Sequence, residues 1–409
     1  MSNPLKGRLL TARLILLAAS AALIAIGIAA IYAVGSPAAP SPAGNTEYLK
    51  GLWEKQLLFA AAGLAGFWAI NMVNYRKLGE ISYWMYGATL VMLAVLLLDK
   101  FIDIPFVPVV NSARCWIRFG DFQFQPSEFC KLAYIIALAW YLRYRSNYRS
   151  FNALIGPFGL TVLPMSLILL EPDLGTVMLM MPVLLAMLFI AGAKVKHLAA
   201  VILMMLAVSP LLWLQMKPYQ RTRISSVLLQ NDTVRKQAQQ HPALANLLVG
   251  GKFSDSRWEN DWGYHLLRSK FAVASGGFTG YGFREGPFIK YNFLPERHND
   301  FIFAVIAHQW GFIGSAAVLG LYVLIIICGL EIATRNSDPF GRLLAIGVVL
   351  LFAVEVLVNV SMTLGLTPIT GLTLPLVSYG GSSLVVSMMA IGLLNSLGRQ
   401  WPYNVARKQ

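Results

Sequence analysis

The chain has 409 residues, of which 57% are hydrophobic and only 13% are charged, and its mean hydropathy is +0.60. A soluble domain carries about a quarter charged residues, so this composition excludes an ordinary soluble protein and indicates a bilayer as the main solvent. The formal net charge of +14 does not indicate nucleic-acid binding. The basic residues fall in short clusters between apolar runs, where membrane proteins place their cytoplasmic loops.

Apolar runs long enough to cross a bilayer recur along the chain, and they predict about ten transmembrane helices. The first run is long for a signal peptide, so we interpret it as an uncleaved first helix. The eighth run is long enough to tilt or to begin outside the bilayer. The predicted fold is an all-α polytopic membrane protein, a single domain over residues 1–409. The predicted spans lie near residues 12–34, 56–73, 80–98, 128–143, 152–170, 174–193, 198–215, 301–333, 341–364 and 379–397.

The basic residues of the short loops all fall on one predicted side of the membrane. Arg76, Arg143, Lys194 and Arg335 mark four of these loops. The positive-inside rule assigns this side to the cytoplasm, so both termini are predicted to be cytoplasmic.

The largest predicted loop covers residues 216–300, between helices seven and eight, on the opposite side. It is far longer than ordinary connections, which makes it a candidate for function. Within it, residues 232–248 contain amphipathic stretches that we expect to lie on the membrane surface.

Two segments near the outer face combine turn signals with ionisable residues. Pro126 and Ser127 indicate a helix start with Ser127 as the N-cap, and Glu128 and Lys131 then share one helix face. Ionisable groups at the end of a span usually face a wet cavity or the protein interior, and we favour a cavity over a simple ion pair. In residues 171–176, Asp173 is expected to cap the next helix, a structural role.

A third segment, residues 292–304, places Asp300 where the long loop enters an apolar run. Partial desolvation there would raise the pKa of Asp300 and make it a better base, whereas a nearby cation such as Lys131 would lower the pKa. The alternative is that Asp300 merely caps the eighth helix. We interpret Arg297 and His298 as solvated loop residues.

Glycine and cysteine residues give further information on turns, helix packing and disulfide bonds. The glycine-rich residues 275–282 predict tight turns, and residues 374–383 open the tenth span with small residues that suit either close helix packing or a wet cavity. Three cysteines, Cys115, Cys130 and Cys328, are too few for a disulfide framework. No Cys/His metal cluster, P-loop or nucleophile elbow is present in the sequence.

Together these segments resemble the SEDS family, the RodA and FtsW type of peptidoglycan polymerase. The resemblance covers nearly the whole chain in order, and its most specific runs are residues 295–303 and 378–383. The matching residues are 113–116, 125–131, 171–176, 263–264, 275–282, 294–304, 359, 365, 368–371 and 375–383.

The resemblance implies an inverting glycosyltransferase of the bacterial cytoplasmic (inner) membrane, which polymerises lipid II into glycan strands for cell elongation or division. It implies that Asp300 is the catalytic residue and that Lys131 lines the central cavity, where it could pair with Asp300. The other implied substrate-binding residues are Glu128, Trp116, Glu296 and Ser382, and Arg114 and Arg118 are candidate pyrophosphate contacts by charge alone.

The resemblance also implies a partner, a class B penicillin-binding protein with transpeptidase activity, within the elongasome or the divisome. No cofactor is expected to be tightly bound, and a divalent cation, Mg²⁺ or Mn²⁺, could assist the leaving diphosphate. Two other functions stay open: a flippase or other transporter of lipid-linked precursors, and a non-catalytic scaffold for a partner synthase. The sequence leaves elongation, division and sporulation roles unresolved.

The chain departs from the family's usual pattern at five positions. These are Cys115, where Arg is usual, His265, where Gln is common, Asn299, where Thr is common, and His308 and Gln309, where acidic residues are common. The aspartate, glutamate and lysine positions are retained, which predicts an active but divergent member.

Overall fold

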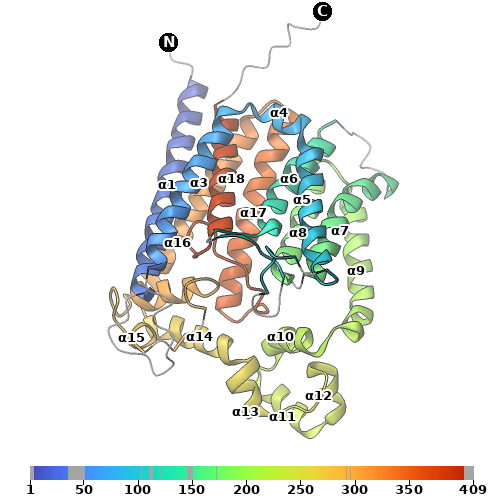
Figure 1. The fold of residues 1–409 in the computed structure, drawn as a ribbon, viewed down its shortest axis with the longest axis vertical. Coiled ribbons are helices and arrows are strands. Elements are labelled where there is room, and N and C mark those ends of the chain that lie inside the picture. Colours follow the sequence, from blue (N-terminus) through green and yellow to red (C-terminus); the bar gives the residue numbers. More distant parts are fainter. Residues whose placement is uncertain are drawn as a thin grey trace, which may run out of the picture.

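The computed structural model describes residues 4–35, 51–102, 104–109, 114–120, 122–144, 151–171, 173–291, 293–294 and 296–399. Long helices form one bundle, and shorter helices form a lobe at one end of it (Figure 1). The bundle helices are α1 (Pro4–Gly35), α3 (Leu52–Met72), α5 (Ser82–Leu98), α6 (Pro126–Leu142), α7 (Ile155–Leu170), α8 (Leu174–Ile190), α9 (Val195–Gln215), α16 (Ile302–Arg335), α17 (Pro339–Thr363) and α18 (Gly381–Gly398).

Each predicted span corresponds to one of these bundle helices, so the all-α polytopic prediction is confirmed. Within the described residues, six helices are long and apolar enough to cross a membrane, namely α1, α7, α9, α16, α17 and α18. Helices α5 and α8 are also apolar but are shorter, with 17 residues each. Helix α3 packs along α18, and α6 packs against α5 and α17, inside the same bundle.

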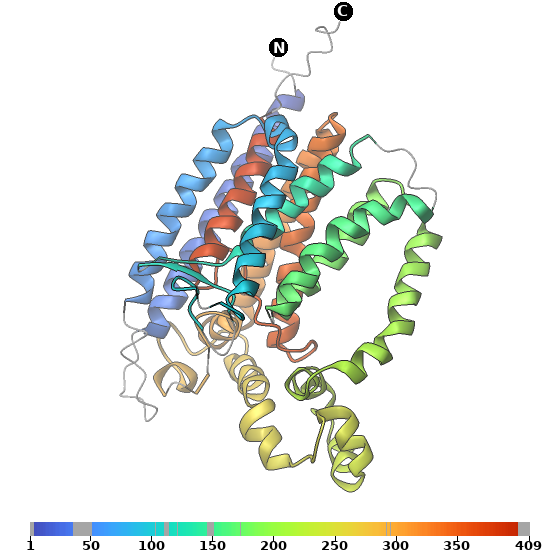
Figure 2. The ribbon, with the colours of Figure 1, turned by 45° about the vertical axis from the view of Figure 1, so that its right-hand side comes forward.

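The described chain begins in α1 and ends after α18 at the same end of the bundle (Figure 1). The short helix α4 (Tyr75–Glu80), which carries Arg76, lies at this end as well. The lobe lies at the opposite end, where α9 leads into it (Figure 2). The structure therefore agrees with an even number of crossings and with a basic residue, Arg76, at the end where α1 begins and α18 ends. The cytoplasmic location of that end stays a prediction.

The lobe consists of α10 (Pro218–Leu228), α11 (Asp232–Gln240), α12 (Pro242–Val249), α13 (Asp255–Arg257) and the π-helical turn η2 (Trp258–Trp262). It has its own small core, formed by Leu229, Ala238, Leu248, Val249 and Trp258. The apolar faces of α11 and α12 pack into this core, which accounts for the amphipathic pattern of residues 232–248. Contact of this segment with the membrane surface stays a prediction.

Helix α16 is broken at Gly311, where the backbone adopts φ 61° and ψ −155°. Residues 302–309 precede the break and are buried in the protein, beside α14 (Tyr264–Gly276). The break leaves main-chain groups without helical partners, and the glycine-rich segment supplies them: Gly282 N–H donates to Gln309 O, and Phe312 N–H donates to Gly277 O. The residues that the sequence assigned to tight turns thus hold the broken helix.

Glycine is required on both sides of this junction. A Cβ on Gly276 would lie 1.9 Å from Ala307 O, and one on Gly311 would lie 2.4 Å from Gly280 N. The first part of α16 is therefore a separate helical segment inside the protein, and the span proper follows the break.

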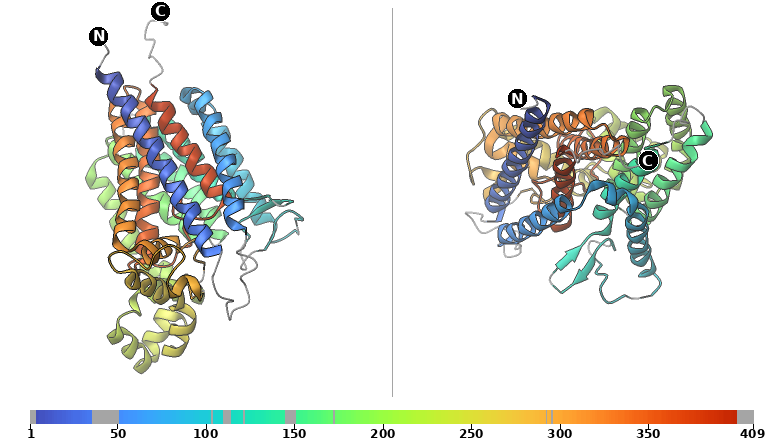
Figure 3. Two further views of the ribbon diagram at one scale, coloured as in Figure 1. Left: turned by 90° about the vertical axis from the view of Figure 1, so that its left-hand side faces the viewer. Right: turned by 90° about the horizontal axis from the view of Figure 1, so that it is seen from above.

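A short hairpin departs from the helical pattern. Strands β1 (Ile117–Phe119) and β2 (Phe122–Phe124) pair antiparallel, with Arg118 opposite Gln123. The hairpin projects from the side of the bundle (Figure 3), and Gln125 follows it directly into α6.

Candidate functional site

A cavity of about 950 Å³ lies between the lobe and the end of the bundle, and Asp300 forms part of its wall. Trp116 and Glu296 line the same cavity, so three residues of the predicted site meet there. Its other lining residues are Pro218, Tyr219, Thr222, Arg223, Ser226, Val249, Gly250, Gly251, Lys252, Arg257, Asp261, Trp262, His265, Asn299, Phe301, Ile369 and Gly371.

The Asp300 side chain does not cap α16. The N-cap position of that helix is Phe301, and no side chain makes a capping hydrogen bond there. Burial, together with the negative charge of Glu296, raises the pKa of Asp300 to about 7, although the positive charge of Arg223 opposes the rise. A carboxyl group that titrates near neutral pH is suited to general-base catalysis.

Side chains from α17 and from the loop before α18 hold the backbone around Asp300. Asn359 Nδ2 donates to Asp300 O over 3.0 Å and to Leu372 O over 2.6 Å. Ser378 Oγ donates to Asn299 O over 2.7 Å. The position of the carboxylate is therefore set by α17 and by the loop before α18.

The interpretation of Arg297 and His298 as solvated residues is wrong. Arg297 is only 1% exposed, and its guanidinium donates to Val34 O over 3.0 Å and to Ile289 O over 3.4 Å. Val34 lies in the last turn of α1, where carbonyls lack helical partners and attract a cation. Burial lowers the pKa of Arg297 to about 10. The His298 ring is buried against Tyr379.

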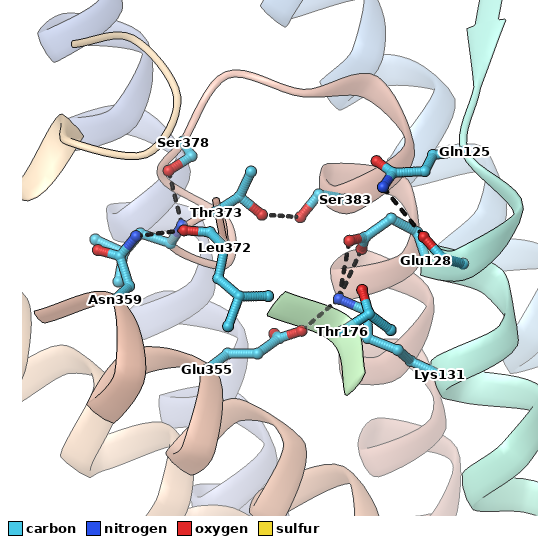
Figure 4. A network of polar contacts seen from close by, with 12 residues as sticks. Gln125, Glu128, Lys131, Thr176, Glu355, Asn359, Leu372, Thr373, Ser378 and Ser383 are labelled. Atoms are coloured by element: carbon cyan, nitrogen blue, oxygen red, sulfur yellow. Dashed lines mark hydrogen bonds and ion pairs between the residues drawn. The ribbon is translucent and has the colours of Figure 1, made fainter. Parts of the chain in front are cut away.

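A buried charge cluster lies inside the bundle. Lys131 Nζ is 2.9 Å from Glu128 Oε1 and 2.5 Å from Glu355 Oε1 (Figure 4). The structure does not show the predicted pairing of Lys131 with Asp300. The Lys131 ammonium group instead pairs with the carboxylates of Glu128 and Glu355. Glu355 was missed because it lies within the apolar run 341–364. A lone carboxylate in such a run is itself a signal.

Asp173 joins the first turns of α6 and α8. It caps α8 as predicted, accepting from Thr176 N–H over 3.1 Å. It also accepts from Ser127 Oγ over 2.9 Å and from Gln125 Nε2 over 3.3 Å. Ser127 is therefore not the N-cap of α6; that position is Gln125, and Pro126 is the first helical residue. The negative charge of Asp173 also contributes to the raised pKa of Asp300.

The remaining predicted residues lie outside the cavity wall. Ser382 is part of the polar network around α6, where its Oγ accepts from Gln125 N–H over 2.9 Å. Arg114 forms an ion pair with Asp99, 3.2 Å away, and Arg118 is exposed on the hairpin. Their assignment as substrate contacts stays a prediction.

The cavity is also lined by three basic residues, Arg223, Lys252 and Arg257. The sequence analysis did not identify them as site residues. All three belong to the long predicted loop, whose length and basic residues were the available signal.

The five departures from the family pattern divide into two groups. His265 and Asn299 line the cavity beside Asp300. The other three make structural contacts: Cys115 Sγ donates to Glu171 O, His308 Nδ1 shares a hydrogen bond with Ser275 Oγ, and Gln309 Oε1 accepts from Arg284 N–H. All three cysteines are free, and burial raises the pKa of the Cys115 thiol to about 12.

The described part of the chain contains no cluster of side chains that would bind a metal ion without a substrate. No group of three His, Cys, Asp or Glu side chains is placed there to hold an ion. The divalent cation expected at a leaving diphosphate stays a prediction.

Comparisons with known proteins place the chain in a family. The model of the FtsW, RodA and SpoVE proteins, described as cell cycle protein, matches residues 13–402. This chain belongs to that family.

Relatives in this family are similar over nearly their whole length. The peptidoglycan glycosyltransferase RodA of Treponema pallidum is 32% identical, over 94% of this chain and 96% of the relative. The peptidoglycan glycosyltransferase MrdB of Escherichia coli is 33% identical over 85% of each chain. Stage V sporulation protein E of Bacillus subtilis is 33% identical, over 86% of this chain and 87% of the relative.

Solved structures of family members share the fold. A chain from a peptidoglycan synthase complex, described for its coordination of polymerization and crosslinking, is 30% identical with a TM-score of 0.70, covering 94% of this chain and 96% of that one. The rod shape determining protein RodA of Thermus thermophilus is 27% identical with a TM-score of 0.62, covering 94% and 95%. This FtsW/RodA/SpoVE family member is therefore a multi-pass membrane protein.

Proposed function

We propose that this protein is a peptidoglycan glycosyltransferase that polymerises lipid II into glycan strands, with Asp300 as its catalytic base. One observation carries the assignment of the base. Asp300 lies in the wall of a cavity large enough for sugar units, with a pKa of about 7 and a backbone held by Asn359. The names of the relatives, peptidoglycan glycosyltransferases, support the reaction.

In the proposed reaction, the Asp300 carboxylate takes the proton from the 4-hydroxyl of the acceptor sugar. The oxygen attacks the anomeric carbon of the growing chain, and a new glycosidic bond forms. The bond from that carbon to the diphosphate breaks, and the electron pair leaves with undecaprenyl diphosphate. Attack from the face opposite the leaving group inverts the anomeric centre, so no covalent sugar–enzyme intermediate is needed.

We place the protein in the bacterial cytoplasmic membrane with the lobe outside and both termini in the cytoplasm. The basic residues at the terminal end of the bundle support this orientation. A class B penicillin-binding protein would crosslink the strands. Support for this partner comes from the similar chain in a complex that coordinates polymerization and crosslinking.

The test is polymerisation of purified lipid II by the full-length protein in detergent or vesicles, with and without its transpeptidase partner. We expect glycan strands from the wild-type protein. Asp300→Ala, checked for folding by its elution profile and thermal unfolding, should lose about 10²–10⁴-fold in rate. A folded Asp300→Ala protein that polymerises normally would exclude the proposed base. A wild-type protein that moves lipid II across vesicles without making strands would favour a flippase.

A further inference from the structure

We propose that Arg223, Lys252 and Arg257 form a binding subsite for the diphosphate of the lipid-linked substrate. The inference rests on the proposed function for the identity of its ligand. The three cations come from the lobe and line the same cavity whose bundle side carries Asp300. Arg223 lies in α10, Lys252 lies in the connection from α12 to α13, and Arg257 ends α13.

The lobe fixes the segments that carry these cations. Val249 and Trp258, which flank the stretch from Lys252 to Arg257, are buried in the lobe core. Ser225 Oγ in α10 donates to Leu248 O over 2.7 Å and so joins α10 to α12.

Gly250 ends α12 with a left-handed φ of 70°. A Cβ on it would lie 3.2 Å from the Pro218 side chain. Glycine thus allows the chain to turn at this point, where Gly250 itself lines the cavity.

Among the residues that the structure describes, Arg223, Lys252 and Arg257 lack the carboxylate partners that Arg235 has in the same lobe. Arg235 is paired with Asp232 and Glu259 and lies over the Trp258 ring, and Lys270 donates to Gln230. Within the described part of the chain, the structure pairs none of Arg223, Lys252 and Arg257 with a carboxylate. Side chains that stabilised only the fold would be expected to resemble Arg235.

A diphosphate fits this arrangement chemically. Guanidinium and ammonium groups are the strong hydrogen-bond donors for phosphate oxygens, and arginine can bind them in a bidentate manner. A diphosphate held on the lobe side would leave the sugar to face Asp300 on the bundle side. The same cations would stabilise the negative charge that develops as the diphosphate leaves.

The experiment compares a triple cavity variant with the wild-type protein, and a double cavity variant with a control variant of equal charge. The cavity variant is Arg223→Gln/Lys252→Gln/Arg257→Gln. The control variant is Arg221→Gln/Lys236→Gln, which removes two cations of α10 and α11 outside the cavity wall. It is compared with the double cavity variant Arg223→Gln/Lys252→Gln. Each purified full-length protein is assayed for polymerisation against lipid II concentration, for inhibition by inorganic pyrophosphate, and for pyrophosphate binding by calorimetry.

We expect each cavity substitution to raise the KM for lipid II about tenfold. Inorganic pyrophosphate should inhibit and bind the wild-type and control proteins, and it should do neither with the cavity variant. Arg223→Lys should restore part of the loss, which a purely structural role would not predict. If the triple variant fails to fold, the exposed single substitutions Lys252→Gln and Arg257→Gln carry the same test.

A wild-type protein that polymerises lipid II, while the cavity variant keeps its KM and pyrophosphate sensitivity, would overturn the subsite and leave the proposed function intact. So would a wild-type protein that does not bind pyrophosphate. If the wild-type protein makes no strands, the proposed function fails. Calorimetry then decides separately, because pyrophosphate binding that depends on the three cations would still establish an anion site.

Discussion

The side-chain amide of Asn359 donates to the main-chain carbonyl of Asp300, with 3.0 Å between nitrogen and oxygen. Glu355 lies one helical turn earlier on α17 and accepts from Lys131. One helix therefore holds both the proposed catalytic segment and the buried charge cluster. The two features share a support, although Lys131 and Asp300 do not pair with each other.

Asn359→Ala should reduce both activity and stability. The substitution leaves the carbonyls of Asp300 and Leu372 without their shared donor, and an unsatisfied buried polar group costs about 1–3 kcal/mol. We expect kcat for lipid II polymerisation to fall about tenfold with a smaller change in KM, because the carboxylate is displaced. The neighbouring Ser361→Ala, on another face of α17, serves as the control. Equal kinetics in the two variants would contradict the supporting role.

Polymerisation should increase with pH through about pH 7. A general base acts only when ionised, and burial raises the pKa of Asp300 to about 7. We expect kcat/KM to fall about tenfold for each pH unit below this value. Arg223→Gln should move the midpoint to higher pH, since the Arg223 charge lowers this pKa. A wild-type midpoint near pH 4, or a shift to lower pH in the variant, would show that another group controls the rate.

Removal of the Lys131 charge alone should destabilise the protein more than its removal together with one carboxylate of the cluster. Lys131→Met leaves Glu128 and Glu355 buried without their cation, and breaking a buried ion pair in this way costs about 3–5 kcal/mol. In Lys131→Met/Glu355→Gln, one of these charges is gone, so unfolding should need more heat than in the single variant. Arg335→Gln, which breaks a partly exposed pair with Glu331, should cost at most about 1 kcal/mol. Strict additivity of the two cluster substitutions would argue against the pairing.

Glu171 should make the folded protein less stable as pH rises. Its side chain is only 1% exposed, and burial raises its pKa to about 9 from an ordinary value of 4.5. The folded state therefore keeps a proton that the unfolded state releases, and stability falls with increasing pH between these values. Glu171→Gln should remove this dependence and gain on the order of 2 kcal/mol near pH 8. The measurement is thermal unfolding of the wild-type protein and of Glu171→Gln at pH 6 and pH 8. An equal loss of stability in both proteins would refute the effect.

Helix positions followed from the sequence because hydrophobic length is a local property. The runs near 12–34 and 341–364 each correspond to one bundle helix, α1 and α17. The break at Gly311 was harder to predict from the sequence, since the residues before it are as apolar as the span that follows. Only the contact with Gly276 and its neighbours shows why the first part of α16 is buried in protein.

Side-chain partners could not be predicted in the same way. Asp300 was found because it stands at a loop-to-span boundary, within a specific run of residues. Glu355 is separated from Lys131 by 224 residues, and Arg297 is separated from Val34 by 263. No periodicity links such positions. An arginine that looks solvated in a polar loop is in fact placed against the end of α1 by the tertiary fold.

The contacts around Asp300 also bear on how the protein is made. Chains fold from the N-terminus during synthesis, so Asp300 is synthesised before Asn359 and Ser378, which hold its backbone. A chain that stalls before α18 would contain the carboxylate but lack the groups that orient it. Premature products released into the membrane would accordingly be inert, and only the finished polypeptide would build cell wall.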